Sequence, residues 1–267
     1  MNSIYDINFA ELYQQHLRTC RYHDVSAAKW DKKAVKFAET FVEKENPYTT
    51  HFLQRIQLNS NETVLDIGCG PGTLAIPLAR RCQQVYALDF SQGMLSLLRQ
   101  YQQQLGLYNI LSIQRAWQDD WSDVPQADVV IASRATLVSD LDEAIDKLTA
   151  KAKKRVYLTA ITRPHFLDRE IFHAIERDDL GFPTYIYLLN RLYQRGIEAE
   201  LYFLPSPTSA FQGEYQDFEN AVEFSLGKLN NAEKTKLFGF YQRKQQQNQP
   251  IQQGQDKWAL ISWQCGR

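Results

Sequence analysis

Residues 64–74 read VLDIGCGPGTL and form the feature of this chain that most restricts its fold. One apolar run ends in Asp66, glycines follow at positions 68, 70 and 72, and a second apolar run ends in Asp89. A strand, a glycine turn and a second strand with an acid at its tip are typical of a βαβ unit that binds a nucleotide cofactor. The pattern therefore predicts a parallel α/β sheet with a cofactor site at one edge.

The periodicity of the chain extends this unit into a larger sheet. Between residue 62 and about residue 162, short β-branched runs alternate with amphipathic segments, which favours parallel strands joined by crossover helices. Strands are predicted at 63–67, 84–88, 110–114, 128–132, 155–160, 200–204 and 257–263. Together they predict a Rossmann-like, doubly wound, seven-stranded and mostly parallel α/β sheet.

Helical periodicity surrounds this core. Apolar residues at i, i+3, i+4 and i+7 predict an N-terminal helical cap at 1–58. Further helices are predicted at 166–177, 185–195, 217–226 and 231–243, the last two with Asp217 and Asn231 as N-caps. The main domain is then 59–267, with a helical insertion at about 210–245. The glutamine-rich stretch at 245–255 has no apolar period and is interpreted as a flexible surface loop.

Composition limits the partners of the chain. It has 267 residues and a formal net charge of -1, so it offers no broad basic field for nucleic acid. The one dense basic run, Lys151, Lys153, Lys154 and Arg155, lies between a predicted helix and a predicted strand. Cations at such a position favour the helix C-terminal dipole. We therefore predict that nucleic acid is not the partner, although a local basic patch is left open.

Redox and targeting signals point to the cytoplasm. The four cysteines, Cys20, Cys69, Cys82 and Cys265, are scattered and predict neither a zinc site nor a disulfide framework. The start of the chain lacks the order of a signal peptide, and no apolar stretch reaches the roughly 18 residues of a membrane span. These patterns predict a cytoplasmic protein that does not bind a membrane.

The glycine spacing distinguishes between nucleotides. A dinucleotide fingerprint has a third small residue at the position of Thr73, whereas this chain has its third glycine at 72. Glycine lets the backbone pass close beneath a ligand because it has no Cβ atom. Asp66 is placed either to accept hydrogen bonds from an ammonium group or to orient the turn itself, and Asp89 is placed to accept both hydroxyls of a ribose.

Residues 62 to about 135 resemble class I S-adenosylmethionine-dependent methyltransferases. VLDIGCGPGTLAIPLA is similar to their first motif, and ALDFSQGML is similar to their second motif in the form found among ubiquinone-biosynthesis-like small-molecule methyltransferases. The resemblance implies that 59–267 is a methyltransferase domain. It also implies that S-adenosyl-L-methionine is the cofactor and S-adenosyl-L-homocysteine the product.

Carried over residue by residue, the resemblance implies a cofactor-binding set. Gly68, Cys69 and Gly70 would line the methionine part, with Asp66 near its amino group, and Asp89 would hold the ribose. The full set is Asp66, Gly68, Cys69, Gly70, Asp89, Phe90, Met94, Ala116, Trp117 and Ser133. Within it, Phe90 and Met94 would pack on the adenine.

The third motif departs from the family. After the third strand the family often has an acid and a small residue, but here Ala116 and Trp117 stand at those places. The backbone N–H of Trp117 would reach an adenine nitrogen and its indole would cover the base; a core role for this indole is the alternative. Either Gln118 or Asp119 would receive the adenine amino group.

The fourth strand ends in Ser133 and Arg134, at the place where the family's sulfonium and acceptor meet. A guanidinium there suits a carboxylate or phosphate of the acceptor. The alternative for Arg134 is a salt bridge to Asp140 or Asp142. In the N-terminal zone, Trp30 and Tyr48 are candidates to close over the cofactor, with packing inside the helical zone as the alternative for Trp30.

Three functions remain open at this level. The first is methyl transfer by in-line displacement to a small-molecule acceptor. The second is an RNA or protein methyltransferase, which a basic surface around Lys151–Arg155 beside the cofactor site would favour, although the fourth strand lacks the Asn-Pro-Pro-Tyr of similar nucleic-acid enzymes. The third is a non-methylating S-adenosylmethionine-binding protein. No catalytic residue and no metal site are predicted, and the acceptor and oligomeric state are open.

Overall fold

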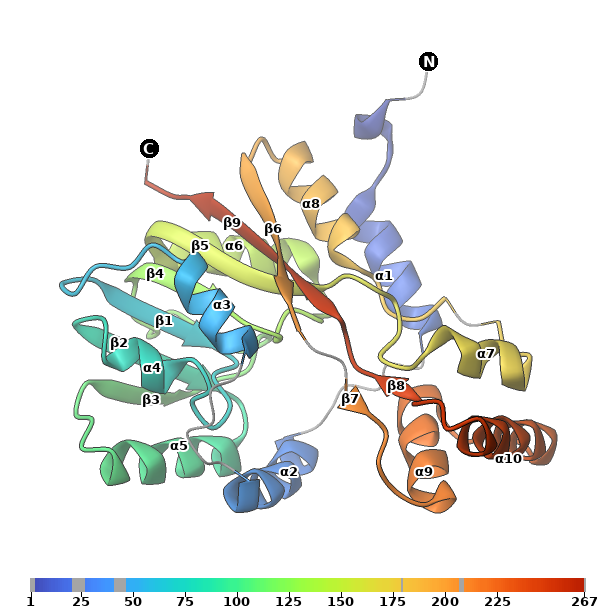
Figure 1. Cartoon of the computed structure of the whole chain (residues 1–267). Helices are drawn as coiled ribbons and strands as arrows, with labels where there is room; N and C mark the ends of the chain where they lie inside the picture. Colours follow the sequence, from blue (N-terminus) through green and yellow to red (C-terminus); the bar gives the residue numbers. More distant parts are fainter. Residues whose placement is uncertain (1–2, 21–26, 41–46, 179, 207–208, 267) are drawn as a thin grey trace.

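The computed structural model describes residues 3–20, 27–40, 47–178, 180–206 and 209–266. The strands of its main sheet are β1 (Thr63–Ile67), β2 (Gln84–Asp89), β3 (Ile110–Gln114), β4 (Ala127–Ala132), β5 (Ala152–Ile161), β6 (Ala199–Pro205) and β9 (Lys257–Gln264). They lie in the order β3-β2-β1-β4-β5-β9-β6, and β9 runs antiparallel to both of its neighbours (Figure 1). The predicted seven-stranded, mostly parallel sheet is confirmed.

Helices cover both faces of the sheet. They are η1 (Ile4–Asp6), α1 (Phe9–Thr19), α2 (Ala27–Thr40), α3 (Pro47–Arg55), α4 (Ala75–Ala79), α5 (Gln92–Gln104), α6 (Leu141–Lys151), α7 (Arg169–Ile175), α8 (Tyr185–Gln194), α9 (Tyr215–Leu226) and α10 (Asn231–Gln246). α3, α4 and α5 share an apolar cluster with one face of the sheet, and α1, α6 and α8 share a second cluster with the other face. The sheet is therefore doubly wound.

Strand geometry explains how one apolar run serves both faces. Successive side chains of a strand point to opposite sides of the sheet. Val64 and Val129 accordingly lie in the cluster under α4 and α5, whereas their neighbours Leu65 and Val130 lie in the cluster under α6. All four are fully buried, and each such burial stabilises the fold by about 1.5–3 kcal/mol.

The helices of the predicted N-terminal zone separate from one another. α1 packs against α8 and α6, α2 packs against α5, and α3 packs against β6. Figure 1 shows α1 and α2 far apart, on either side of the strand ends. The division into a cap at 1–58 and a domain at 59–267 stays a prediction. None of the helices among the described residues is long and apolar enough to cross a membrane.

A third apolar cluster gathers beyond the strand ends of the main sheet (Figure 1). It combines α9 and α10 of the predicted insertion with α7, so this helical group also draws on residues upstream of 210. The short strands β7 (Ser209–Ala210) and β8 (Gln252–Gln253) pair beside it. The glutamine-rich stretch is thus partly regular: α10 continues to Gln246, and Ile251 is buried in the cluster.

The predicted N-caps of the last two helices are wrong. α9 begins at Tyr215 after Glu214, which places Asp217 inside the first turn. α10 has Asn230 as its N-cap because the Asn230 side chain accepts the Glu233 N–H while the Glu233 carboxylate accepts the Asn230 N–H. Asn231 is the first helical residue. This reciprocal pairing satisfies two backbone donors, which a cap at Asn231 would not.

Candidate cofactor and acceptor site

The glycine loop after β1 is held against the end of β2. The N–H groups of Gly68 and Cys69 both donate to the Leu88 carbonyl, at 2.7 and 3.0 Å. Gly68, Gly70 and Gly72 have φ values of 67°, 54° and 97°, which other residues rarely adopt. The helix that follows, α4, begins at Ala75. The loop itself therefore forms the floor of this part of the site.

Two buried carboxyl groups flank the loop. Asp89 accepts the Gly70 N–H at 2.8 Å and the Ser91 N–H at 2.9 Å. Asp66 is only 2% exposed, and its Oδ2 has no hydrogen-bond partner among the described residues. Burial first, and the charge of Asp89 second, raise the pKa of Asp66 to about 8. Burial likewise raises the pKa of Asp89. The ligand-free site thus holds two buried carboxyl groups for which the described residues provide no cationic partner, and Asp66 favours its protonated form.

The Cys69 thiol lies in the same loop and donates to the Gly70 carbonyl at 3.6 Å. It is buried, and burial followed by the nearby charges of Asp66 and Asp89 raises its pKa well above the usual range. These causes hold the Cys69 thiol in its neutral form. Among the described residues no disulfide links Cys20, Cys69, Cys82 or Cys265, in line with their scattered positions.

A third carboxylate, Asp31, reaches this region from α2. Its Oδ1 accepts the Ser91 hydroxyl at 2.6 Å and the Gly93 N–H at 2.9 Å, at the start of α5. The approach is so close that a Cβ at Gly93 would lie 3.0 Å from the Asp31 Cα atom. The Ser91 hydrogen bond is the main cause that lowers the pKa of Asp31. Sequence reasoning missed Asp31, whereas it had singled out its neighbour Trp30, which is partly buried in α2.

The residues predicted to surround the adenine lie after β2 and β3. Phe90 is partly buried and Met94 is 1% exposed. Ala116 accepts the Trp121 indole N–H at 2.8 Å, and its own N–H donates to Asp119 Oδ2 at 2.7 Å. Asp119 thus holds the turn after β3.

Trp117 connects two loops of the site. Its indole N–H donates to the Ala135 carbonyl at 2.9 Å, and its ring packs against Trp121 with centroids 5.3 Å apart. Ala135 in turn closes over Gly68, where an added Cβ would overlap the Ala135 Cβ. The loops after β1, β3 and β4 therefore meet through these residues, and Trp117 is partly buried against the core as well as placed at the site.

The end of β4 meets Tyr48 of α3. The Tyr48 hydroxyl lies 2.7 Å from Ser133 Oγ and 2.9 Å from Thr159 Oγ1. The Arg134 N–H donates to the same Thr159 oxygen at 2.9 Å. Tyr48 is 1% exposed, so it packs into the core beneath Ser133 and is not an open lid. Thr159, on β5, contacts these candidate residues although no sequence motif indicated it.

Arg134 does not form the alternative salt bridge. Asp140 caps α6 by accepting the Glu143 N–H, and Asp142 pairs with Arg191 and Arg195. The Arg134 guanidinium instead lies over the Tyr48 ring, with Cζ 3.6 Å from its centroid, and 5.2 Å from the Trp258 centroid. Arg134 and Ser133 are thus neighbours at the carboxyl end of β4, as predicted.

The hydroxyl contacts of Tyr48 lead to a stability prediction. Tyr48→Phe should lower the free energy of unfolding by about 1–3 kcal/mol, because the ring stays while a buried hydroxyl with two partners is lost. Thermal and urea unfolding would measure the change. Tyr108→Phe is the matched control, since Tyr108 is 93% exposed. A Tyr48→Phe protein as stable as this control would contradict the assigned contacts.

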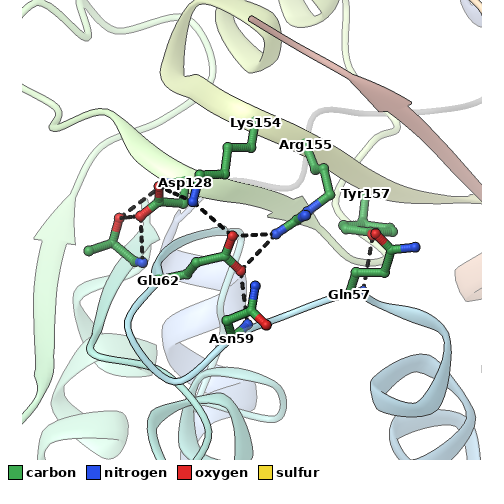
Figure 2. Close-up of polar contacts among 8 residues, drawn as sticks. Gln57, Asn59, Glu62, Asp128, Lys154, Arg155 and Tyr157 are labelled. Atoms are coloured by element: carbon green, nitrogen blue, oxygen red, sulfur yellow. Dashed lines mark hydrogen bonds and ion pairs between the residues drawn. The ribbon is translucent and has the colours of Figure 1, made fainter.

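The basic run at 151–155 lies at the opposite edge of the sheet. Figure 2 shows Arg155 donating to both oxygens of Glu62, at 2.5 and 2.7 Å, with Lys154 bridging Glu62 and Asp128. Burial would raise the pKa of Glu62, but the Asn59 N–H and these two cations hold it below its ordinary value. Lys151 occupies the last turn of α6, as its predicted dipole contact requires. These contacts lie where β1, β4 and β5 begin.

The strand order defines a Rossmann-like protein, and the candidate cofactor site lies at the carboxyl ends of β1, β2 and β4. A family model described as a methyltransferase domain matches residues 64–155. An uncharacterized protein of Haemophilus influenzae is 58% identical over 266 residues, which are 99% of each chain. A probable cobalt-precorrin-6B C(15)-methyltransferase (decarboxylating) of Methanothermobacter thermautotrophicus is 30% identical over 146 residues, which are 52% of this chain and 70% of that protein.

Solved structures share the same fold. Phospholethanolamine N-methyltransferase 2 of Haemonchus contortus, in complex with phosphomonomethylethanolamine and S-adenosylhomocysteine, matches with a TM-score of 0.53 and 13% identity. The match covers 98% of this chain and 61% of that chain. The chain belongs to the class I S-adenosylmethionine-dependent methyltransferases. Its cofactor is S-adenosylmethionine.

Proposed function

We propose that this methyltransferase acts on a small-molecule acceptor. The observation that carries the proposal is the place of the dense basic run. Lys154 and Arg155 are engaged by Glu62 and Asp128 at the amino-terminal edge of the sheet, so they form no basic surface beside the cofactor site. The RNA and protein alternatives lose the feature that would favour them. The form of the motif ALDFSQGML supports a place near the ubiquinone-biosynthesis-like small-molecule group.

The residues of the site fit the cofactor. The unpartnered Asp66 Oδ2 would accept the ammonium group of the methionine part, next to Gly68 and Cys69. Beside Gly70 there is open space, since an added Cβ would touch nothing within 4 Å. Asp89 Oδ2 accepts the Gly70 N–H and Oδ1 accepts the Ser91 N–H, and an ionised carboxylate has about four acceptor positions, so acceptor capacity remains for the ribose.

We assign the adenine to the neighbourhood of Phe90, Met94, Ala116 and Trp117. The Trp117 indole N–H is already bonded to Ala135, so its ring face, not its N–H, would meet the base. Ser133 would border the methyl group from the end of β4. Either Gln118 or Asp119 would take the adenine amino group; Gln118 fits better because the Asp119 carboxylate is engaged with the Ala116 N–H.

The bound cofactor supplies a methyl group on a sulfonium, which a nucleophile of the acceptor displaces in line. The task of the protein is to hold both partners in line and to exclude water, which can supply about 7–11 kcal/mol of the barrier. The buried Tyr48 and Trp258 close the site on the α3 side. The Ser133 and Tyr48 hydroxyls share a hydrogen bond that fixes the position of Ser133.

Calorimetric titration tests the cofactor site. S-adenosylmethionine should bind and NAD should not, and Asp89→Ala should raise the dissociation constant for S-adenosylmethionine at least about tenfold because each lost ribose hydrogen bond contributes of order 1 kcal/mol. Asp146→Ala is the control, since Asp146 lies on α6 and is 63% exposed. Equal affinities of the Asp89→Ala and Asp146→Ala proteins would show that Asp89 does not hold the ribose.

Transfer of label tests the acceptor. The protein is incubated with methyl-labelled S-adenosylmethionine and an extract of the cells that produce it. Label should enter the dialysable fraction beyond the level reached by the Asp89→Ala protein. Label confined to precipitated RNA or protein would overturn the small-molecule proposal. Cofactor binding without transfer to any fraction would favour the non-methylating alternative.

A further inference from the structure

The candidate site is divided by charge. Asp31, Asp66 and Asp89 lie on the side formed by β1, β2 and the start of α5. Arg134 lies on the side formed by β4 and β5. S-adenosylmethionine carries positive charge at its sulfonium and ammonium groups, which suits the acidic side. The Arg134 side would repel these cations unless a negative group lies between them.

The structure holds Arg134 in place without neutralising it. Its φ of 56° is a left-handed conformation that is costly for a residue with a side chain. The hydrogen bond from its N–H to Thr159 Oγ1 fixes this conformation. The side chain is thereby directed over the buried rings of Tyr48 and Trp258. A backbone fixed in this way is typical of functional sites.

The guanidinium keeps its capacity for an anion. In the part of the chain that the structure describes, no carboxylate forms an ion pair with Arg134, since the two candidates, Asp140 and Asp142, are engaged elsewhere. Arg134 is exposed as a whole residue; burial against Tyr48 lowers the pKa of its guanidinium, which stays charged because arginine is not deprotonated in proteins. A planar guanidinium with a fixed stem binds carboxylate and phosphate oxygens in a bidentate manner. Stacking on Tyr48 fixes the plane of the guanidinium, and its five N–H donors exceed what Tyr48 can accept, so donors remain for such a group.

We infer that Arg134 determines acceptor specificity: it binds a carboxylate or phosphate group of a small acidic acceptor and so places the acceptor's nucleophile between β4 and the glycine loop. This inference rests on the proposed small-molecule function. The anion would also offset the repulsion between Arg134 and the cofactor. Cofactor and acceptor would then bind cooperatively, each on the side of opposite charge.

The test uses the full chain saturated with S-adenosylhomocysteine, titrated calorimetrically with three probes that share one ring: benzoate, phenyl phosphate and neutral benzamide. The wild-type protein should bind at least one of the two anions at least about tenfold more tightly than benzamide, and which anion binds better identifies the oxyanion. Arg134→Gln should abolish this preference, whereas Arg134→Lys should retain part of it because a point charge cannot form the bidentate pair.

Arg55→Gln is the matched control, because Arg55 also stacks on a tyrosine, Tyr202, at 4.8 Å, and lies at the far end of α3 from Tyr48. Its anion preference should equal that of the wild type. Binding of S-adenosylmethionine is measured for every variant. If all proteins bind it but anion and amide bind the wild type equally, or neither anion binds, or Arg134→Gln keeps the preference, the inference about Arg134 is overturned while the cofactor site stands. Loss of cofactor binding in the wild type would overturn the proposed function itself.

Discussion

Gly70→Ala should leave the protein folded and yet weaken its binding of S-adenosylmethionine at least about tenfold. A Cβ at this position would meet no protein atom within 4 Å. The free energy of unfolding should therefore fall only by the cost of an alanine in a left-handed conformation, about 1–2 kcal/mol. The same methyl group would occupy the space that we assign to the methionine part of the cofactor. Thermal unfolding and calorimetry on one preparation separate the two effects.

Gly68→Ala should behave in the opposite way. Its φ is similar, at 67°, but its Cβ would overlap the Ala135 Cβ, so the overlap adds to the same backbone cost and should destabilise the fold by about 3 kcal/mol or more. The double variant Gly68→Ala/Ala135→Gly removes the overlapping methyl group and should regain part of that stability. If Gly70→Ala binds the cofactor as the wild type does, the cofactor does not lie against Gly70.

Binding of S-adenosylmethionine should strengthen as the pH rises toward about 8, the pKa to which burial and then the charge of Asp89 raise Asp66. The ammonium group of the cofactor requires the ionised carboxylate, so binding at lower pH must release the Asp66 proton. The affinity then increases by up to about tenfold per pH unit. Above this range the affinity should fall again, since the α-amino group of the cofactor loses its proton with a pKa of roughly 7.7–8.

Calorimetry in buffers of different ionisation enthalpy would measure the released proton directly at pH 7. The Asp66→Asn protein should bind S-adenosylmethionine more weakly and release no proton on binding. Its affinity should not change with pH below about 7. Asp146→Asn, on the exposed face of α6, is the control and should keep the proton release of the wild type. Proton release that persists in Asp66→Asn would assign the linkage to another group.

The Asp66 carboxyl group also determines how the unfolding free energy of the ligand-free protein changes with pH. Because its folded pKa is raised above the unfolded value of 3.8 to about 8, folding favours the protonated form. The resulting stabilisation is complete below the unfolded pKa and is lost as the pH rises through the folded pKa. Relative to Asp66→Asn, the wild type should therefore lose up to about 1.4 kcal/mol of unfolding free energy per pH unit across this window.

The sequence was sufficient for the sheet and for the strand-end acids. Each strand is a short apolar run between turn residues, and burial on both faces makes that signal strong. Asp66 and Asp89 stand at fixed places relative to the glycines, so their approach follows from one local βαβ unit. Ser133 and Arg134 were placed by the same logic, because parallel strands end at one edge.

The remaining site residues depend on contacts between distant segments. Asp31 reaches Ser91 from a helix 60 residues earlier, and Thr159 meets Tyr48 across 111 positions. No local spacing carries such information, and Trp258 has the pattern of an ordinary core residue. The predictions of the N-cap residues were wrong for a related reason. Several polar residues lie near each helix start, and only the backbone geometry determines which of them is the cap.

The charge network of Figure 2 has a consequence for how such sequences diverge. Glu62 is 2% exposed, and loss of Arg155 alone would leave this buried carboxylate without two of its hydrogen bonds, which is destabilising. We therefore expect these two positions to change together in related sequences: a protein with an apolar residue in place of Glu62 should also have lost Arg155. Such paired exchanges at the amino-terminal ends of β1 and β5 would leave Asp89 and Arg134 unchanged. Sequence differences at these amino-terminal ends can therefore accumulate without changing the residues of the candidate site.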